Sequence, residues 1–391
     1  PDNRFAQFGS VGAAWIFSEE NFVKNHLRFL SFGKFKASYG TTGNDQIGDY
    51  QYFQSWTSSG INPYQGFSVL RSNGAANPSY AWERTQKMEF QLDLSFLNNR
   101  FQLSSSYYRN RSSNQLVRTS LPPSAGFSSL LVNLDAVVQN SGWEFEVFGK
   151  IIHKAGFTWQ SSINLTIPRN KLVAFPGLAN STYSSYYVIG EPINIVRTYD
   201  YLGVDPQTGL YKFQDYNSDG TINYIDQQLT KEVGQEYYGG FQNSLTYKNI
   251  AVEFLFQFSK QTGFTYLSNG SPPGFNSNQP VQILDRWTKQ GDDAETQKYT
   301  QTYGDAFFTY YYYTGNAGVS DASFIRLKNV SISYRLPGTQ LSKLGLKQLR
   351  IYLQGQNLFT ITNFIGLDPE SQRFNSLPPL RMLSAGIQLG F

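Results

Sequence analysis

Apolar and polar side chains alternate along the last eleven residues of the chain, 381–391. One face of this segment collects the side chains of Leu383, Ala385, Ile387, Leu389 and Phe391. The residues between them are small or polar. A period of two is the pattern of a β-strand whose two faces meet different surroundings. The segment therefore predicts a strand with one apolar and one wet face.

Ten further segments repeat this alternation. In one of them, Met88, Phe90 and Leu92 alternate with Glu89 and Gln91. Most of the segments are close to the ten or so residues that a tilted strand needs to cross a bilayer. The predicted strands are 8–17, 32–40, 86–97, 100–111, 142–152, 156–167, 238–248, 250–260, 323–335 and 348–358.

The apolar parity slips within segment 323–335. Ile325 and Leu327 fall on one parity, whereas Val330 and Ile332 fall on the other. A β-bulge would explain the slip, because one extra residue reverses the side on which later side chains project. A strand that begins later in the segment would explain it equally well.

The connections between the predicted strands fall into two classes. Short ones are residues 98–99, 153–155 and 249, and they predict tight hairpins. Long ones are 41–85, 112–141, 168–237, 261–322 and 359–379. If the carboxy terminus is periplasmic, every long connection lies outside, which is the rule of outer-membrane barrels. Such barrels have even strand numbers, so we expect a twelfth strand within 168–237.

Composition supports a membrane barrel. A soluble strand can also alternate, but a chain that ends on its strand with an aromatic residue is typical of a barrel's closing strand. Of the 391 residues, 16% are aromatic and only 15% are charged, which suits a surface that faces hydrocarbon. No apolar run reaches the roughly 18 residues of a helical span. We therefore predict an all-β transmembrane antiparallel barrel in the cell outer membrane.

Several other classes of protein are disfavoured. The net charge of +4 is small for this length and forms no basic block, so we expect no nucleic-acid partner. Cysteine is absent, which removes disulfides and thiolate sites. The two histidines, His26 and His153, stand in no metal-binding spacing, and no nucleophile or phosphate-binding motif is present. We therefore predict that the chain is not an enzyme.

Residues 215–226 match a twelve-residue calcium loop. Oxygen donors occupy positions 1, 3 and 5, Gly220 allows the sharp turn at position 6, and a carboxylate stands at position 12. Asp226 replaces the usual glutamate, and its shorter reach weakens bidentate binding. The alternative is a polar turn without an ion. The candidate ligands of a structural Ca²⁺ are Asp215, Asn217, Asp219, Asn223, Asp226 and the carbonyl of Thr221.

Aromatic residues in the long connections are candidates for ligand contact. Their flat apolar rings and hydroxyl groups suit sugars or peptides. The alternatives are packing within the connection, contact with a partner protein, or an interfacial girdle. The candidates are Tyr310, Tyr311, Tyr312 and Tyr313 in one connection and Trp56 and Tyr64 in another.

Several motifs, in order along the whole chain, resemble a known family. They are Ser10-Val-Gly-Ala-Ala-Trp15 with Phe17-Ser-Glu-Glu20, Phe35-Lys-Ala-Ser-Tyr-Gly-Thr-Thr-Gly-Asn44, Asn77-Pro-Ser-Tyr-Ala-Trp-Glu83, Gly203-Val-Asp-Pro-Gln-Thr-Gly209, Phe324-Ile-Arg-Leu-Lys-Asn-Val330, Asn357-Leu358 and Gly366-Leu-Asp-Pro-Glu370. Together they are similar to the barrel of SusC/RagA-type TonB-dependent transporters.

The resemblance implies that residues 1–391 are the carboxy-terminal portion of a plugged barrel of about 22 strands. The family's signal peptide, amino-terminal domain, TonB box, plug and early strands have no counterpart here. Because the chain opens on Pro1, we expect it to be a mature or truncated form. Eleven or twelve strands leave two open edges, which lipid does not tolerate. We expect other residues to supply the rest of the barrel, the alternative being a smaller closed barrel.

The resemblance also implies a function. It is the TonB-energised import of a nutrient such as an oligosaccharide or oligopeptide, under a SusD-like lipoprotein lid. The TonB complex would act through the missing amino-terminal part. Two alternatives remain: a passive pore or surface-binding barrel without TonB coupling, and an outer-membrane enzyme of the barrel type. The partners expected are the lid, the TonB complex, outer-membrane lipid and the nutrient.

Overall fold

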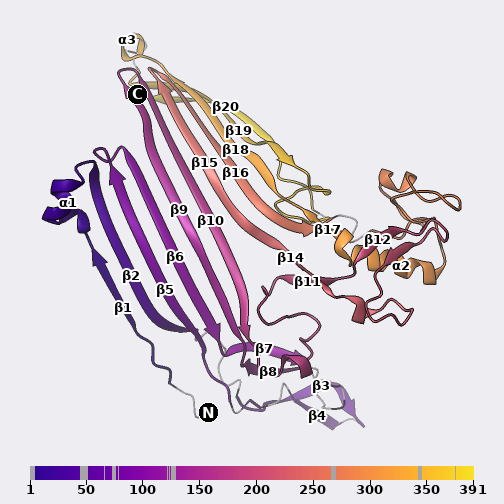
Figure 1. Ribbon diagram of the computed structural model, residues 1–391. Helices are drawn as coiled ribbons and strands as arrows, with labels where there is room; N and C mark the ends of the chain where they lie inside the picture. The colour runs from indigo at the N-terminus through magenta and orange to yellow at the C-terminus, as the bar shows by residue number, and fades with distance from the viewer. Residues whose placement is uncertain are drawn as a thin grey trace. The chain divides into compact units, whose positions relative to one another are not determined.

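The computed structural model describes residues 5–44, 52–65, 67–72, 76–77, 79–120, 122, 124, 129–265, 270–341, 346–374 and 376–391. Most of them lie in antiparallel strands (Figure 1). The strands are β1 (Ser10–Trp15), β2 (Leu30–Asn44), β3 (Trp56–Tyr64), β4 (Phe67–Ser72), β5 (Glu83–Phe96), β6 (Phe101–Ser113), β7 (Gln115–Ser120), β8 (Ser129–Leu134), β9 (Val137–Lys154), β10 (Phe157–Ala174), β11 (Ile195–Thr198), β12 (Tyr201–Val204), β13 (Tyr211–Phe213), β14 (Leu229–Glu232), β15 (Gly234–Tyr247), β16 (Ile250–Phe264), β17 (Val319–Asp321), β18 (Phe324–Arg335), β19 (Gln348–Thr362) and β20 (Met382–Gly390).

In the described part of the chain, helices are few and short. The α-helices are α1 (Asn21–His26), α2 (Tyr303–Tyr313) and α3 (Gly338–Leu341), and the 3-10 helices are η1 (Phe17–Glu19), η3 (Leu178–Asn180), η4 (Tyr224–Asp226), η6 (Val281–Leu284) and η7 (Asn316–Gly318). Among the residues described, no helix is both long enough and apolar enough to cross a membrane.

The main sheet confirms the eleven predicted strands. Its hydrogen-bonded order is β1-β2-β5-β6-β9-β10-β15-β16-β18-β19-β20, and β17 pairs with β16 beside this path. The prediction of a twelfth barrel strand within 168–237 is wrong. The strands that begin and end there, β11 to β14, have only three or four residues each and pair with one another in two small sheets. The twelfth member is β17, in the next long connection.

Two compact units make up the chain. The first consists of Pro1–Asn99, Leu103–Glu144 and Pro168–Ile193, and the second of Arg100–Gln102, Phe145–Ile167 and Asn194–Phe391. In the first unit, strands β1, β2 and β5 pair in order and place Trp15, Phe35 and Leu92 in one row. The next row pairs Lys36 with Gln91. The two faces of the wall are therefore unlike, as the alternation predicts.

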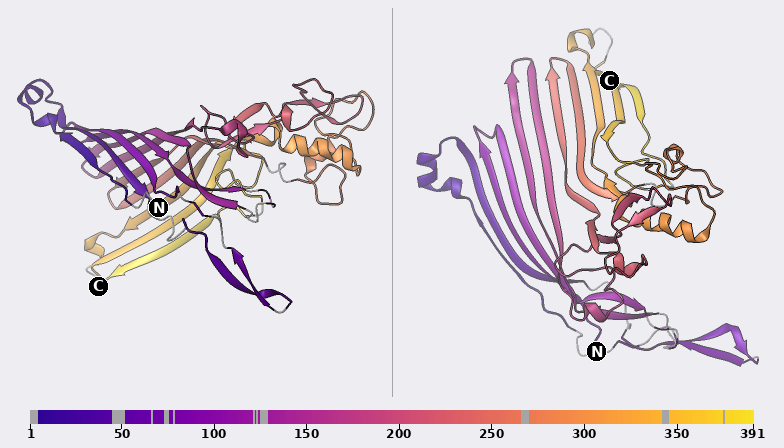
Figure 2. Two further views of the ribbon diagram at one scale, coloured as in Figure 1. Left: turned by 90° about the horizontal axis from the view of Figure 1, so that it is seen from below. Right: turned by 45° about the vertical axis from the view of Figure 1, so that its right-hand side comes forward.

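The second unit repeats this arrangement over five strands. Figure 2 shows from two sides that β15, β16, β18, β19 and β20 lie side by side. One cross-strand row is apolar and consists of Leu245, Val252, Ile332, Leu353 and Ala385. The adjacent row is polar and consists of Ser244, Glu253, Ser331, Gln354 and Ser384. Leu383 and Ile387 of the last strand are 78% and 66% exposed, and both belong to the apolar face.

A β-bulge accounts for the parity slip in β18. Leu327 and Asn329 face two adjacent residues of β16, which leaves Lys328 as the extra residue. The pairing of β18 with β19 is irregular at the same level, where Asn357 adopts a φ of 50°. The strand begins at Phe324, so the bulge explanation is confirmed over the later start.

Short and long connections lie at opposite ends of the strands within each unit. In the second unit, Lys248 of one tight turn donates to Gly156 of another, and Arg335 donates to Asn249. Lys347 beside α3 donates to Gly390 at the end of the last strand. These contacts gather the tight turns, α3 and the carboxy terminus at one end, and β11 to β14 and α2 lie at the other (Figure 1). The predicted separation of short and long connections is confirmed.

Buried apolar clusters lie in the long connections and their borders. One cluster consists of Ala136, Val138, Leu172 and Phe175, and the other of Tyr199, Tyr211 and Phe213. The long strands themselves keep large apolar side chains exposed, including Phe35, Ile332 and Leu353. A wall that places one face against lipid needs no second layer to cover it, because lipid takes the place of a core.

Candidate functional site

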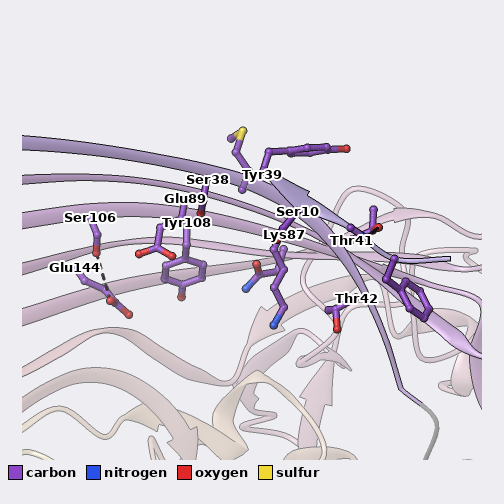
Figure 3. Close-up of a pocket in the computed structure, with 15 residues that line it drawn as sticks. Ser10, Ser38, Tyr39, Thr41, Thr42, Lys87, Glu89, Ser106, Tyr108 and Glu144 are labelled. Carbon is purple, nitrogen blue, oxygen red and sulfur yellow. Dashed lines mark hydrogen bonds between the residues drawn. The ribbon is translucent and has the colours of Figure 1, made fainter. Parts of the chain in front are cut away.

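The polar face of the first unit contains a cavity of about 810 Å³. Strands β2, β5, β6 and β9 contribute Ser38, Glu89, Tyr108 and Glu144 to its lining. Figure 3 shows Glu89, Tyr108 and Glu144 projecting to the same side of the sheet, with the Ser106 hydroxyl donating to Glu144 at 3.4 Å. Carboxylates, hydroxyls and amides on one wall suit a water-filled passage that contacts a solute or a plug.

Ion pairs on this wall hold some of the charges. Lys36 Nζ lies 3.0 Å from Asp93 Oδ2, and both side chains are partly exposed. The Ser104 hydroxyl and the Gln91 amide also donate to Asp93, each at 2.8 Å. The charges of Lys36 and Asp93 on the polar face are thus part of a hydrogen-bonded network. Partly exposed pairs of this kind contribute little to stability, so we assign them to the surface chemistry of the wall.

A buried charge cluster lies on the polar face of the second unit, and no single motif of the sequence predicts it. Arg326 on β18 donates to both Asp368 and Glu370 of the β19–β20 connection, the bond to Glu370 measuring 2.6 Å. Lys328 Nζ also lies 3.2 Å from Glu370. Two motifs that are 42 residues apart, 324–330 and 366–370, meet in this cluster. The sequence offers two hints of this cluster. Arg326 and Lys328 stand where the apolar parity of β18 slips, and two acidic residues stand close together in Asp368-Pro-Glu370.

The predicted calcium loop folds as a compact polar turn. Asp215 Oδ2 accepts from Gly220 N at 2.8 Å, and Asn217 Oδ1 accepts from Asp219 N at 3.1 Å. Asp226 is fully buried and accepts from the backbone of Tyr216 at 3.0 Å. The other oxygen of Asp215 is buried and has no hydrogen-bond partner.

The arrangement of these donors fits a cation in part. Asn223 and Asp226 close a capping box at η4, so both oxygens of Asp226 already accept backbone hydrogen bonds. Within the described residues, no three histidine, cysteine or acidic side chains converge as a metal site. The free oxygen of Asp215 is the atom that would gain most from an ion, because a buried carboxylate oxygen without a partner is unfavourable.

The consecutive tyrosines of α2 separate by position on the helix. Tyr312 stacks on Tyr211 with ring centroids 4.2 Å apart, and Tyr311 lies 4.7 Å from Tyr199. Burial raises the pKa of Tyr199 to about 12, with smaller contributions from nearby Tyr311, Tyr310 and Asp226. Tyr313 is buried and donates to the Ser271 carbonyl. The packing alternative therefore describes Tyr311, Tyr312 and Tyr313.

Other aromatic residues of the outer connections are open to solvent. Tyr310 is 56% exposed, and Tyr303 and Phe307 on the same side of α2 are also exposed, with their rings 5.0 Å apart. Trp56 on β3 is exposed as well. Tyr64 ends β3 opposite Phe67, but its side chain lies outside the described part of the chain. Trp56 belongs to the first unit and Tyr310 to the second.

The motif at 77–83 has a structural explanation in the first unit. Asn77 donates to the Leu131 carbonyl at 3.0 Å, which ties the segment to β8. Glu83 accepts from Leu116 N at 3.1 Å and from the Asn44 amide at 3.2 Å. The motif therefore joins β5 to β2 and to the β7–β8 hairpin, and its role is positional.

Known proteins resemble the chain along its whole length. "TonB-dependent receptor P3" of Formosa agariphila is 28% identical over 439 residues, which cover 100% of this chain and 42% of that protein. "TonB-dependent receptor SusC" of Bacteroides thetaiotaomicron is 27% identical over 427 residues, covering 100% of this chain and 40% of that protein. The chain is related to the carboxy-terminal part of SusC/RagA-type TonB-dependent receptors. It is accordingly an outer-membrane chain, as its strand pattern predicts.

A solved structure shows the same fold. The RagAB peptide transporter superposes with a TM-score of 0.83 at 24% identity, covering 100% of this chain and 44% of that one. The RagAB peptide importer in the open-open state superposes equally well, with a TM-score of 0.83. No family profile matches the chain. The chain spans about two fifths of the length of the curated relatives it matches.

Proposed function

We propose that this chain forms part of the wall of an outer-membrane importer that takes up a nutrient with energy delivered through TonB. The observation that carries the proposal is its similarity, over its whole length, to curated TonB-dependent receptors. The unlike faces of the sheet support it, since a wall between lipid and a water-filled passage needs an apolar and a polar side. The relatives are named receptors or transporters, which favours transport over catalysis.

We further propose an oligopeptide or oligosaccharide as the nutrient and a SusD-like lipoprotein as a lid. One similar structure is named a peptide transporter, and one similar sequence is SusC. The exposed aromatic side chains of Tyr310 and Trp56 supply flat surfaces for a sugar ring, a peptide side chain or the lid. Tyr311, Tyr312 and Tyr313 would then support this surface from behind.

An uptake experiment in the native organism tests the import. The parent strain and a strain that lacks the gene are each given two probes, a peptide digest and an oligosaccharide mixture. Mass spectrometry then follows their loss from the medium. We expect the parent alone to deplete one probe, and a protonophore to stop it. Depletion that ignores the protonophore would indicate a passive pore, and equal depletion by both strains would reject import.

We also propose that the loop 215–226 binds one Ca²⁺ as a structural clip. Asp215, Asn217, Asp219, Asn223, Asp226 and the Thr221 carbonyl would supply the oxygens that this hard cation prefers. The partnerless buried oxygen of Asp215 supports the proposal. Binding would require the carboxylate of Asp226 to exchange a backbone hydrogen bond for the ion. The ion would order a long polar connection and neutralise much of its negative charge.

A further inference from the structure

Part of the β19–β20 connection lies against the polar face of the second unit. We call residues 366–372 the strap. Gln257 on β16 donates to Glu370 at 3.0 Å. Gln261, four residues later on the same face of β16, donates to the Pro369 carbonyl. A Cβ built on Gly263 would lie 2.1 Å from the end of the Gln372 side chain, so Gln372 packs closely over this glycine and a larger residue would displace it. The strap therefore packs against a defined surface of β16, formed by Gln257, Gln261 and Gly263.

This surface of β16 lies on the polar face of the sheet. Gln257, Ser259 and Gln261 alternate along β16 with Phe256 and Phe258, so their side chains project away from the apolar face. Gln257 faces Arg326 on β18, and Arg326 faces Thr360 on β19. The strap thus contacts two strands, β16 and β18, on the side of the sheet that would face a water-filled passage.

Arg326 is the centre of the cluster that holds the strap. Its side chain is 4% exposed and that of Asp368 is 2% exposed, so the pair is withdrawn from water. The Nε of Arg326 donates to Thr360 at 2.9 Å, which orients the guanidinium toward the two strap carboxylates. Asp368 also accepts from Ser371 N at 3.1 Å. Three of the five N–H donors of this arginine thereby have named partners.

A buried ion pair is costly to form, because both charges lose their hydration. Removal of one partner costs more, since it leaves an unpaired charge in a dry site. Such a pair therefore selects one position of the strap more than it adds net stability. Glu370 differs from Asp368, because its side chain is about one third exposed and it is shared with Lys328. Glu370 is the accessible end of the cluster.

We infer that the strap is a cover over the polar wall of the passage, and that Arg326 is the positioning residue that holds it closed through Asp368. Release of the strap would expose Ser259 and Gln261, which are both 4% exposed with the strap in place. The inference goes beyond the proposed import, because it concerns the state of the cover whether or not a nutrient moves. Its test reads the cover itself.

Residues 1–391 contain no cysteine, and labelling of the unsubstituted full receptor is subtracted as background. Ser259 is 4% exposed and lies between the two glutamines that bind the strap, so Ser259→Cys places a nearly isosteric thiol beneath the cover. The receptor is displayed on intact cells with its own full chain. A membrane-impermeant maleimide is added from outside, and Val281→Cys, which is 77% exposed, serves in parallel to count displayed receptors.

The parent S259C protein should react slowly. Addition of Asp368→Asn should accelerate labelling about tenfold or more, because one partner of the buried pair has lost its charge. Arg326→Lys should give a smaller increase, since a single ammonium can still pair with Asp368. Glu370→Gln should also give a smaller increase. Arg373→Gln, an exposed charge beside the strap, is the matched control and should leave the rate unchanged.

Equal labelling of the parent and the D368N variant would overturn the inference, as would equal acceleration by the R373Q control. A variant that fails to assemble is recognised by loss of V281C labelling, and the R326K and E370Q variants, which keep part of the cluster, then decide. Labelling rates of S259C that are unchanged in both R326K and E370Q would also overturn the inference that the strap covers Ser259. A parent receptor that shows the expected labelling pattern but takes up no nutrient would count against the proposed import and leave the inference about the strap standing.

Discussion

The indole nitrogen of Trp159 donates a hydrogen bond of 2.9 Å to the side-chain oxygen of Asn243, on the apolar face of the second unit. The register places Trp159 opposite Leu245, beside Asn243 on the neighbouring strand. Asn243 is 2% exposed, and its amide nitrogen has no hydrogen-bond partner. An amide on a lipid-facing surface is unfavourable, and the indole offsets part of that cost.

Trp159→Phe should therefore destabilise the receptor by about 1–3 kcal/mol, because it leaves the asparagine oxygen unpaired. The double variant Trp159→Phe/Asn243→Leu should recover most of this loss, since no polar group then remains to be satisfied. The temperature at which the folded band disappears in heat-modified gel electrophoresis measures both. A double variant less stable than W159F would contradict this interpretation.

Terbium luminescence tests the calcium clip. Tyr216 and Tyr224 both lie within the loop and would transfer excitation to a Tb³⁺ ion bound in place of Ca²⁺. We expect a signal that added Ca²⁺ displaces and that Asp219→Asn reduces strongly. Asp205→Asn, which removes a charge from another exposed turn, is the control and should keep the signal. A signal equal in D219N and the parent would place the ion elsewhere.

The two groups of aromatic residues should respond differently to substitution. Tyr310→Ala should weaken uptake or binding of the nutrient and leave the fold of its connection unchanged, because this ring is largely exposed. Tyr211→Ala should instead loosen the connection by about 3–5 kcal/mol, since it empties the buried cluster that packs against α2. Limited proteolysis of the surface connections separates the outcomes. Rapid cleavage of Y310A would assign Tyr310 to packing.

The strap should be insensitive to pH near neutrality. Burial alone would raise the pKa of Asp368, but hydrogen bonds from Arg326 and Ser371 and the arginine charge outweigh it and lower the pKa. A lowered pKa means that the carboxylate stabilises the strap above its unfolded pKa of about 3.9 and loses this effect as pH falls through the lower folded value. Hydrogen exchange of the strap, corrected for its intrinsic pH dependence, should rise only below about pH 4. A rise between pH 5 and 7 would contradict this.

The strands could be predicted from sequence because each of their faces meets a uniform environment. Val252 and Phe254 on one side and Glu253 on the other leave a signal at every residue. The bulge at Lys328 was visible for the same reason, as a reversal of that signal. The twelfth strand could not be located from sequence. The strands within 168–237, β11 to β14, pair with one another in small sheets and do not join the main sheet. Their three or four residues carry too little alternation to identify them.

The candidate site was predictable only in part. Four consecutive tyrosines on a helix face all sides of it, so the sequence could not tell which of them are buried. Tyr312 packs on Tyr211 from a segment about a hundred residues away, and no local pattern announces that contact. The Arg326–Asp368 pair is likewise formed by tertiary folding. The motifs 324–330 and 366–370 can be recognised in the sequence, but their contact with each other cannot.

If the sheet separates lipid from a water-filled passage, the reactivity of single cysteines should alternate along β16. Single cysteines at positions 252, 253 and 254 of the full receptor are exposed in intact membranes to a water-soluble maleimide and to a lipid-soluble one. We expect Glu253→Cys to react with the water-soluble reagent, and Val252→Cys and Phe254→Cys to react only with the lipid-soluble one. Equal reactivity of all three positions toward the water-soluble reagent would contradict it.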